Sequence, residues 1–231
     1  HCYGFATKLL FNSPIFLFTF LPLTLAIFYL VRTYINGSAA LLALVVASLI
    51  FYGYWSPPFV WLLVTSMLIN YAFVRILSKH PSNLNLSAAI ILNLAVLGYF
   101  KYRFFLAENL LLFFDTSGLT NSAADHVVPL AISFFTFQQI ALLFDITDQR
   151  TKVDSPLDYI AFVALFPQLI AGPIVLFKEM RGQFAEIKSN NHGGLELFCP
   201  GVMVFSIGLF KKVVLADSIA PYSDMAFAMV E

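Results

Sequence analysis

A few polar side chains inside long apolar runs are the residues of this chain that could do chemistry. Ser133, Thr136 and Gln139 are spaced by three residues, so at about 100° per residue they share one face of a helix. Gln138 and Asp145, seven residues apart, form a second polar stripe on the same helix. Burying an amide without a partner costs roughly 2–7 kcal/mol, so these groups need partners. They predict either hydrogen bonds between neighbouring helices or a polar passage lined by Gln138, and both interpretations stay open.

A second unusual feature is the segment Phe166–Ile174, which places two prolines and a glycine inside one uncharged run. Each proline removes a backbone donor and crowds the carbonyl four residues earlier. Broken backbone at membrane depth is tolerated only where it is buried in protein or lines a water-filled cavity. The segment therefore predicts a functional cavity, with Gln168 inside the break, or alternatively a proline-kinked helix used for packing.

Other residue types that commonly act in catalysis or metal binding show no useful spacing. The two cysteines, at positions 2 and 199, predict neither a disulfide framework nor a metal site. All four histidines lie outside the apolar runs, namely His1, His80, His126 and His192. None of them has a partner at a spacing that would make it a general base, and no phosphate-binding loop, zinc-ligand spacing or Gly-x-Ser-x-Gly elbow is present in the sequence. We therefore assign no catalytic and no metal-binding residue within the chain.

The composition indicates the environment in which these polar groups act. Of 231 residues, 60% are hydrophobic and 11% are charged, whereas soluble domains have roughly 45–50% and about 25%. This excludes a single soluble globule, and it also excludes a disordered chain, because disordered chains are polar and charged. The 13 basic residues balance 13 acidic ones, so no net field attracts nucleic acid. The lipid bilayer is the predicted partner.

Uncharged runs long enough to cross a bilayer predict the elements that carry these residues. A spanning helix needs about 20 apolar residues. Six such runs lie between charged residues. One lies between Lys8 and Arg32, two between Arg32 and Arg75, and one each within Lys79–Lys101, Asp125–Asp145 and Asp158–Lys178. The run Leu197–Phe210 holds only 14 residues and predicts a shorter re-entrant or interfacial helix. The predicted fold is an all-α, polytopic transmembrane helical bundle of about six spans plus that shorter helix, with Lys178–Gly194 as its longest polar loop.

The residues Ser155–Asp158 predict the start of a helix. Ser155 can cap it, and Pro156 fits the first turn, where a backbone donor is not needed. Asp158 suits the positive end of the helix dipole.

Five strings of residues occur in a recognisable order along the chain. They are Leu10–Pro14, Tyr99–Tyr102, Pro129–Gln138, Phe166–Ile174 and Gly208–Val213. Together they resemble the membrane-bound O-acyltransferase family, in particular its alginate O-acetylation type, and the resemblance runs from about Leu9 to Ala220. Three departures bear on acceptor preference more than on membership: Ala131 replaces a usual glycine, Leu176 a frequent arginine, and Ile146-Thr147 a usual valine-tyrosine pair.

The resemblance implies a multi-pass enzyme of the bacterial inner (cytoplasmic) membrane. Such an enzyme moves an acyl group, acetyl in the alginate branch, from a cytoplasmic thioester to hydroxyls of an exported polysaccharide such as alginate. Acetyl-CoA or another acyl thioester is then a donor substrate, and no bound cofactor is expected. Periplasmic acetyltransferase proteins and the polysaccharide acceptor pathway are the expected partners. Residues 1–14 would be a lead-in, and residues 15–231 the N-terminal part of the acyltransferase domain.

The resemblance also implies that the catalytic residue lies outside this chain. The general-base histidine of the family is expected in a Trp-His segment downstream of the lysine pair Lys211-Lys212, beyond Glu231. The four histidines here lie in no matching motif, so the fragment is expected to be inactive alone. Gln138 and Gln168 are expected to line the cavity and to donate hydrogen bonds to the substrate. Alternatives from other classes are half of a small-solute transporter, a class that also uses broken helices, and a non-catalytic export scaffold.

Overall fold

The structure, a computed structural model, describes residues 11, 13–113, 129–169, 172–173, 175–189 and 198–228. All regular elements within these ranges are helical. In chain order they are η1 (Phe16–Phe20), α1 (Leu21–Tyr34), α2 (Gly37–Trp55), η2 (Pro57–Phe59), α3 (Val60–Lys79), α4 (Asn83–Phe113), α5 (Ile132–Thr147), α6 (Pro156–Ala164), α7 (Phe166–Leu169), α8 (Phe177–Lys188), α9 (Phe198–Phe210), η3 (Lys211–Ala216) and α10 (Asp217–Ala228). The predicted all-α fold is therefore confirmed.

Five helical stretches are long and apolar enough to cross a membrane. They are Phe16–Tyr34, Gly37–Trp55, Pro57–Lys79, Asn83–Tyr102 and Phe198–Phe227. The first four follow the first four predicted runs, and the second and third are separated at Ser56, where the backbone leaves the helical conformation. The shorter apolar helix α5 accompanies them. The chain is thus a multi-pass membrane protein.

The fifth and sixth predicted runs form shorter helices than their lengths suggest. α5 begins only at Ile132, because Ala131 has left-handed backbone angles (φ 60°, ψ 12°) that a right-handed helix does not accommodate. α6 ends at Ala164 after nine residues, and α7 holds four. Pro167 has no backbone donor with which to continue the hydrogen-bond ladder of α6. The sixth run therefore contains a break and is not one continuous span.

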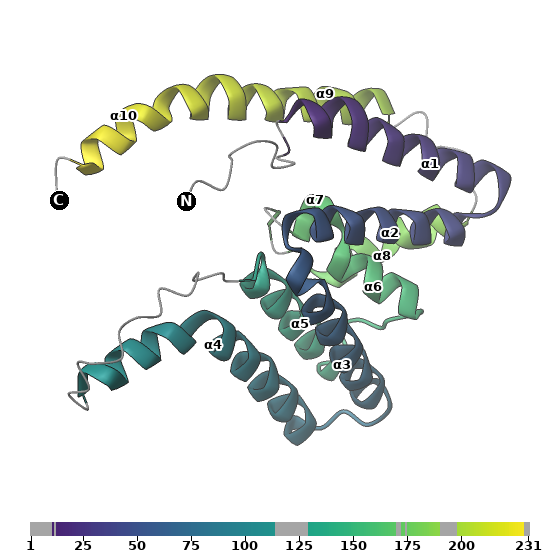
Figure 1. Cartoon of the computed structure of the whole chain (residues 1–231). Coiled ribbons are helices and arrows are strands. Elements are labelled where there is room, and N and C mark those ends of the chain that lie inside the picture. The colour runs from purple at the N-terminus through teal and green to yellow at the C-terminus, as the bar shows by residue number, and fades with distance from the viewer. Residues whose placement is uncertain are drawn as a thin grey trace.

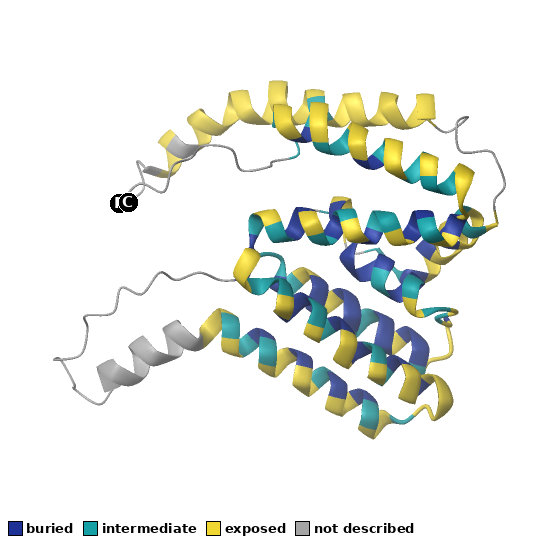
Figure 2. Cartoon of the chain, turned by 45° about the vertical axis from the view of Figure 1, so that its right-hand side comes forward, coloured by how far each residue is buried: buried dark blue, intermediate teal, exposed yellow. Residues whose placement is uncertain are grey.

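The predicted short segment at Leu197–Phe210 is wrong in length. α9, η3 and α10 run on as one C-terminal arm over residues 198–228 (Figure 1), of which 30 residues are apolar enough to cross a membrane. Lys211 and Lys212 end the uncharged run but not the helix, because lysine fits a helix interior well. The Lys212 ammonium also pairs with Asp217 across the π-helical turns of η3. Among the side chains described in the arm, none is buried (Figure 2).

Helix packing is centred on α2, which contacts α1 and also packs against α6 and α8. α3, α4 and α5 pack against one another in the lower half of Figure 1. The main hydrophobic core draws on α2, α3, α5, α6 and α8 and includes the buried side chains of Leu63, Leu143 and Phe162. Figure 2 shows buried residues gathered on these helices. The core therefore surrounds α5 and α6, the helices that carry most of the polar residues discussed below.

A second, smaller cluster of phenylalanine rings fixes the start of α7. Phe16, Phe20 and Phe51, from η1 and α2, form an aromatic cradle around Phe166. The Phe166 ring centroid lies 6.0 Å from that of Phe16, 5.3 Å from that of Phe20 and 5.4 Å from that of Phe51. Aromatic pairs at such distances attract one another beyond the effect of area burial. The residue that follows Leu165 is thus packed against η1, the first helical element that the structure describes, and against α2.

Candidate functional site

The break between α6 and α7 leaves two backbone groups without their usual helical partners. In an unbroken helix the N–H of Phe166 would donate to the carbonyl of Phe162. Leu165 instead has extended backbone angles (φ −54°, ψ 114°) and separates the two groups. The Phe162 oxygen accepts from Gln138 Nε2 at 2.9 Å, and the Phe166 N–H donates to Ser48 Oγ at 3.1 Å. Side chains of α5 and α2 thus replace the lost helical hydrogen bond.

These two replacements lie where water does not reach. Gln138 is 4% exposed and Ser48 is 0% exposed. A buried backbone group left without a partner would cost about 1–3 kcal/mol. The predicted hydrogen bonding between helices is therefore present at Gln138. The alternative role of Gln138, lining a passage for substrate, stays a prediction.

Other amides of the core also connect helices. Gln139 donates from Nε2 to Ser66 Oγ of α3 at 3.1 Å, and its Oε1 accepts from the Tyr159 hydroxyl of α6 at 2.8 Å. Asn70 and Asn93 exchange two bonds between Nδ2 and Oδ1, of 3.0 and 2.7 Å, and so join α3 to α4. Each of these amides is buried and paired, as an interior of low dielectric requires.

The two predicted stripes of α5 are both turned toward protein. Thr136 and Gln139 of the first stripe are buried, and Ser133 is partly exposed. Gln138 and Asp145 of the second stripe are buried as well. The exposed large side chains of this helix are Phe134, Phe137 and Phe144. The prediction that α5 does not simply face lipid is confirmed, because Thr136, Gln138, Gln139 and Asp145 are buried.

Gln168 lies within the break and differs from the paired amides. Its side chain is partly exposed, but its Nε2 atom is buried and has no hydrogen-bond partner among the described residues. The Gln168 backbone carbonyl accepts from the N–H of Gly172 at 3.1 Å. A Cβ atom at Gly172 would lie 2.6 Å from the Gln168 Cα, so only glycine fits there. Gln168 is therefore fixed in its backbone and has an amide donor to spare, whereas positions 170, 171 and 174 of the predicted segment lie outside the described residues.

The histidines and cysteines give no second candidate in the part of the chain that the structure describes. His80 is the exposed residue that follows α3, and Cys199 is exposed on α9. His1, His126 and His192 lie outside the described residues. Among the described residues, no group of three or more His, Cys, Asp or Glu side chains could hold a metal ion.

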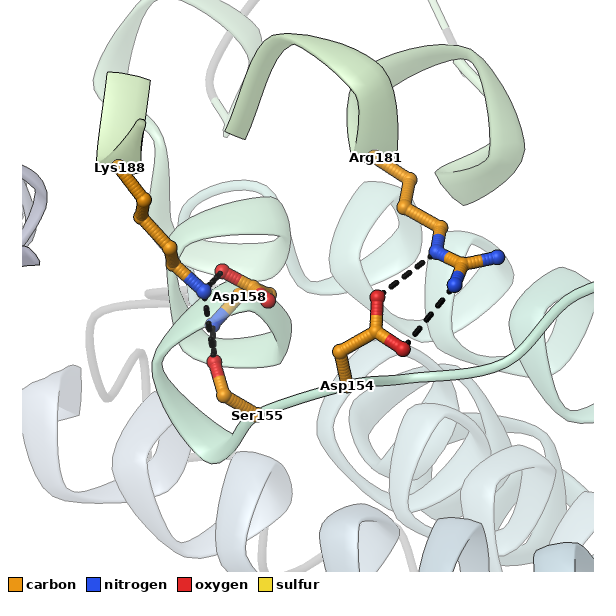
Figure 3. A network of polar contacts seen from close by, with 5 residues as sticks. All are labelled: Asp154, Ser155, Asp158, Arg181 and Lys188. Atoms are coloured by element: carbon orange, nitrogen blue, oxygen red, sulfur yellow. Dashed lines mark hydrogen bonds and ion pairs between the residues drawn. The ribbon is translucent and has the colours of Figure 1, made fainter. Parts of the chain in front are cut away.

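A cluster of ion pairs beside α6 is absent from the sequence-based predictions (Figure 3). Arg181 donates twice to Asp154, with 2.8 Å from Nε to Oδ2 and 3.0 Å from Nη2 to Oδ1. Lys188 Nζ lies 2.5 Å from Asp158 Oδ1 and 3.1 Å from Ser155 Oγ. Ser155 Oγ also accepts from the backbone N–H of Asp158 at 3.2 Å, which confirms the predicted helix start.

The basic residues of this cluster belong to a helix, α8, in a segment predicted to be loop. The prediction for Lys178–Gly194 is wrong over its first part, because Phe177–Lys188 is helical. The buried face of α8 consists of Phe177, Met180 and Phe184. Their spacing of three and four residues is the sequence signal for such a helix, and a search for uncharged runs cannot detect it. Glycine at position 37 lets α2 approach the end of α8, since a Cβ on Gly37 would overlap the Ile187 carbonyl.

Several known bacterial proteins are similar to this chain over nearly all of its length. A model of the family described as MBOAT, membrane-bound O-acyltransferase, matches residues 49–231. The Helicobacter pylori peptidoglycan O-acetyltransferase is 39% identical over 249 aligned positions, which cover 95% of this chain and 46% of that protein. Probable alginate O-acetylases of Azotobacter vinelandii and Pseudomonas putida are 35% and 37% identical over 96% of this chain and over 44% and 45% of their own lengths. The chain thus spans a little under half the length of these relatives, and no solved structure matches it.

Proposed function

The chain belongs to the membrane-bound O-acyltransferase family, and on that premise we propose that it forms part of an enzyme that moves an acetyl group from a thioester to hydroxyls of a polysaccharide. One similar protein is named for peptidoglycan and others for alginate, and a sugar hydroxyl is acceptor chemistry that both names share. The proposed donor is acetyl-CoA or another acyl thioester at the cytoplasmic face of a bacterial inner membrane. The proposed partners are periplasmic acetyltransferase proteins and the polysaccharide acceptor pathway.

The break between α6 and α7 is the observation that carries this proposal. Transfer between a thioester and a hydroxyl inside a membrane protein needs polar groups fixed in place where bulk water is absent. Irregular backbone at membrane depth persists only where the protein or a cavity supplies its hydrogen-bond partners. Here Gln138 and Ser48 supply them. A segment supported in this way can present polar groups to a substrate and keep its own backbone satisfied.

We assign to Gln168 the role of a donor to the reacting carbonyl. Its Nε2 has no partner among the described residues, so a substrate oxygen would gain a bond that the protein does not already use. When the sugar hydroxyl attacks the thioester carbon, the C=O electron pair moves to oxygen, and an amide N–H stabilises that charge. The C–S bond then breaks, the electrons return to form the ester C=O, and the thiolate leaves. Gln138, which bonds Phe162 and not the substrate, is a positioning residue.

The remaining part of the reaction is assigned to residues outside those described. The acceptor proton goes to a general base, proposed to be the downstream histidine that the family resemblance implies, and such help contributes typically about 10²–10⁴-fold. Holding donor and acceptor together contributes up to roughly 7–11 kcal/mol of the barrier. The helices described here would supply that second contribution, and the isolated chain is expected to be inactive.

Transfer of radiolabelled acetyl by the full-length protein in membrane vesicles tests the proposal. Label from acetyl-CoA is expected in polysaccharide, and Gln168→Leu is expected to lower the rate by about 10²-fold, the typical loss for one oxyanion donor. Gln183→Leu is the matched control, because Gln183 is exposed on α8, and it is expected to leave the rate unchanged.

Two results would contradict the proposal in different ways. Label that crosses the membrane without becoming covalently bound to polysaccharide would favour the transporter alternative and overturn the proposed function. Equal rates for Gln168→Leu and Gln183→Leu would remove Gln168 from the site and leave the acyl transfer itself standing.

A further inference from the structure

A cavity of about 580 Å³ lies beside the C-terminal ends of α3 and α5, against the segment 149–154. Its polar lining consists of Ser78, Lys79, Gln149, Thr151, Lys152 and Asp154. The volume falls within the range of small-molecule sites, about 300–1,000 Å³. The cavity belongs neither to the break between α6 and α7 nor to the residues proposed to act on the thioester.

The charges around this cavity leave it positive. Lys79 and Lys152 are exposed and form no ion pair with a carboxylate among the described residues. The carboxylate in the lining, Asp154, is held by the Arg181 guanidinium through bonds of 2.8 and 3.0 Å. Asp148, on the same loop, is paired with Arg150 at 2.9 Å. Asp145, which precedes the lining residue Ile146, is buried and has no ion pair among the described residues. The two lysines therefore outnumber this one unpaired carboxylate, and their ammonium groups are left for a ligand.

A buried hydroxyl of the lining points to a bound group. Thr151 is 5% exposed, and its hydroxyl makes no hydrogen bond within the described part of the chain. Buried hydroxyls are nearly always paired, so this one calls for a partner. Gln149, with a positive φ of 56°, ends α5 as a left-handed cap, since its N–H donates to the Ile146 carbonyl at 3.0 Å and the Arg150 N–H donates to the Asp145 carbonyl at 2.8 Å.

We propose that this cavity binds a phosphate group, held by the ammonium groups of Lys79 and Lys152 and by the hydroxyl of Thr151. A phosphate offers several charged acceptor oxygens, which suit two lysines and one hydroxyl donor. The candidate span Pro57–Lys79 ends at this cavity, so the site lies where the chain leaves the apolar layer and lipid headgroups begin. The phosphate can therefore belong to a lipid headgroup or to a soluble molecule.

The size of the expected effect follows from the charges. The carbonyl ends of α3 and α5 lie beside the cavity and disfavour an anion, so binding depends on the lysines. Each lysine near a membrane surface contributes about fivefold to the binding of an anionic group, and the two together about 30-fold. The Thr151 hydroxyl, as a donor to a charged oxygen, contributes about tenfold.

Binding to the purified full-length protein in detergent tests this site with two probes. Phosphatidylglycerol is compared with dioleoylglycerol, which lacks phosphate, by native mass spectrometry, and inorganic phosphate is titrated by calorimetry. The variant Lys79→Gln/Lys152→Gln is expected to bind about 30-fold more weakly. The matched control Lys101→Gln/Lys178→Gln removes two exposed lysines elsewhere and is expected to bind as the unmodified protein does. Thr151→Val keeps the side-chain shape and is expected to weaken binding about tenfold.

Each outcome bears on the proposal. Selective binding of phosphatidylglycerol supports a headgroup site, and binding of inorganic phosphate with the same variant pattern supports a soluble ligand. Binding of neither probe overturns the proposal, as does an equal loss in the two double variants. If the Lys79→Gln/Lys152→Gln variant loses its helical circular dichroism, the test rests on Thr151→Val. Unchanged phosphate binding by Thr151→Val would then overturn the proposed site.

Discussion

The helical core and the C-terminal arm are both apolar, but their polar residues behave in opposite ways. In the core, Gln138 and Gln139 are buried and bond to residues of other helices. In the arm, Lys212 and Asp217 are exposed and pair with each other on the same helical stretch. By length and hydropathy the arm is a candidate membrane span, whereas α5, which carries the two glutamines, is a shorter apolar helix. The partner of each polar group is what distinguishes a helix that builds a site from one that presents its side chains to lipid or to another protein segment.

The same two regions show that charge and helix continuity are independent. The residues between Asp158 and Lys178 carry no charge, yet their helix ends at Ala164, three residues before Pro167. The arm carries Lys211 and Lys212, yet it is continuous and about 45 Å long at 1.5 Å per residue. Charge thus determines which solvent a segment prefers but not whether its helix continues. One missing backbone donor does not decide this alone either, because Pro221 lies inside α10.

The largest expected contrast between the two regions comes from removing one aromatic ring in each. Phe162 is 1% exposed in the core and Phe227 is 75% exposed in the arm. Phe162→Ala is expected to lower the free energy of unfolding by about 3–5 kcal/mol, because it leaves a cavity. Phe227→Ala is expected to change it by less than about 0.5 kcal/mol. Denaturant unfolding in detergent measures both, and equal losses would show that the arm is packed as tightly as the core.

A smaller contrast comes from removing one amide. Gln138→Leu leaves the Phe162 carbonyl without its partner and is expected to cost about 1–3 kcal/mol of stability. Gln183→Leu, on the exposed face of α8, is expected to cost less than about 0.5 kcal/mol. Thermal unfolding followed by circular dichroism compares them. A Gln138→Leu variant as stable as its control would mean that the carbonyl finds another donor.

The two lysine–aspartate pairs give the next contrast. Lys188 is 24% exposed and its partner Asp158 is 6% exposed, so Lys188→Met is expected to cost about 1.5 kcal/mol. Lys212 and Asp217 are 57% and 40% exposed, so Lys212→Met is expected to cost less than about 1 kcal/mol. Raising the salt concentration should abolish the Lys212 effect and reduce the Lys188 effect only partly. Identical salt dependence at both sites would contradict the difference in burial.

The smallest effect has the opposite sign. Ala131 adopts φ 60° immediately before α5, a conformation that costs residues other than glycine about 1 kcal/mol. Ala131→Gly is therefore expected to stabilise the protein by about that amount, whereas Ala141→Gly, inside α5, is expected to destabilise it by roughly 0.5–1 kcal/mol. A loss of stability in both variants, seen as lower unfolding temperatures, would show that Ala131 is not strained.

Local chemistry is what the sequence predicts well. The helix start at Ser155 is confirmed, because its signal lies within four residues. The break near Pro167 is predicted from the two prolines and the glycine that lie within one uncharged run. The side chains that bond to the free backbone groups at the break cannot be predicted in this way. Ser48 and Phe166 are 118 positions apart, and the sequence around each residue gives no sign of its partner. α8 is missed for a different reason, because its apolar face is narrow and its remaining residues are charged or polar. The sequence predicts a role for Gln168 from the prolines and the glycine around it. That the Gln168 Nε2 atom has no hydrogen-bond partner among the described residues can be learned only from the structure.

The aromatic cradle has a consequence for the order in which the protein is made. Ribosomes deliver a chain from its N-terminus, so Phe16, Phe20 and Phe51 enter the membrane well before Phe166 is synthesised. The docking place for α7 is thus assembled ahead of its occupant, and the late-arriving ring completes a contact that the earliest segments have prepared.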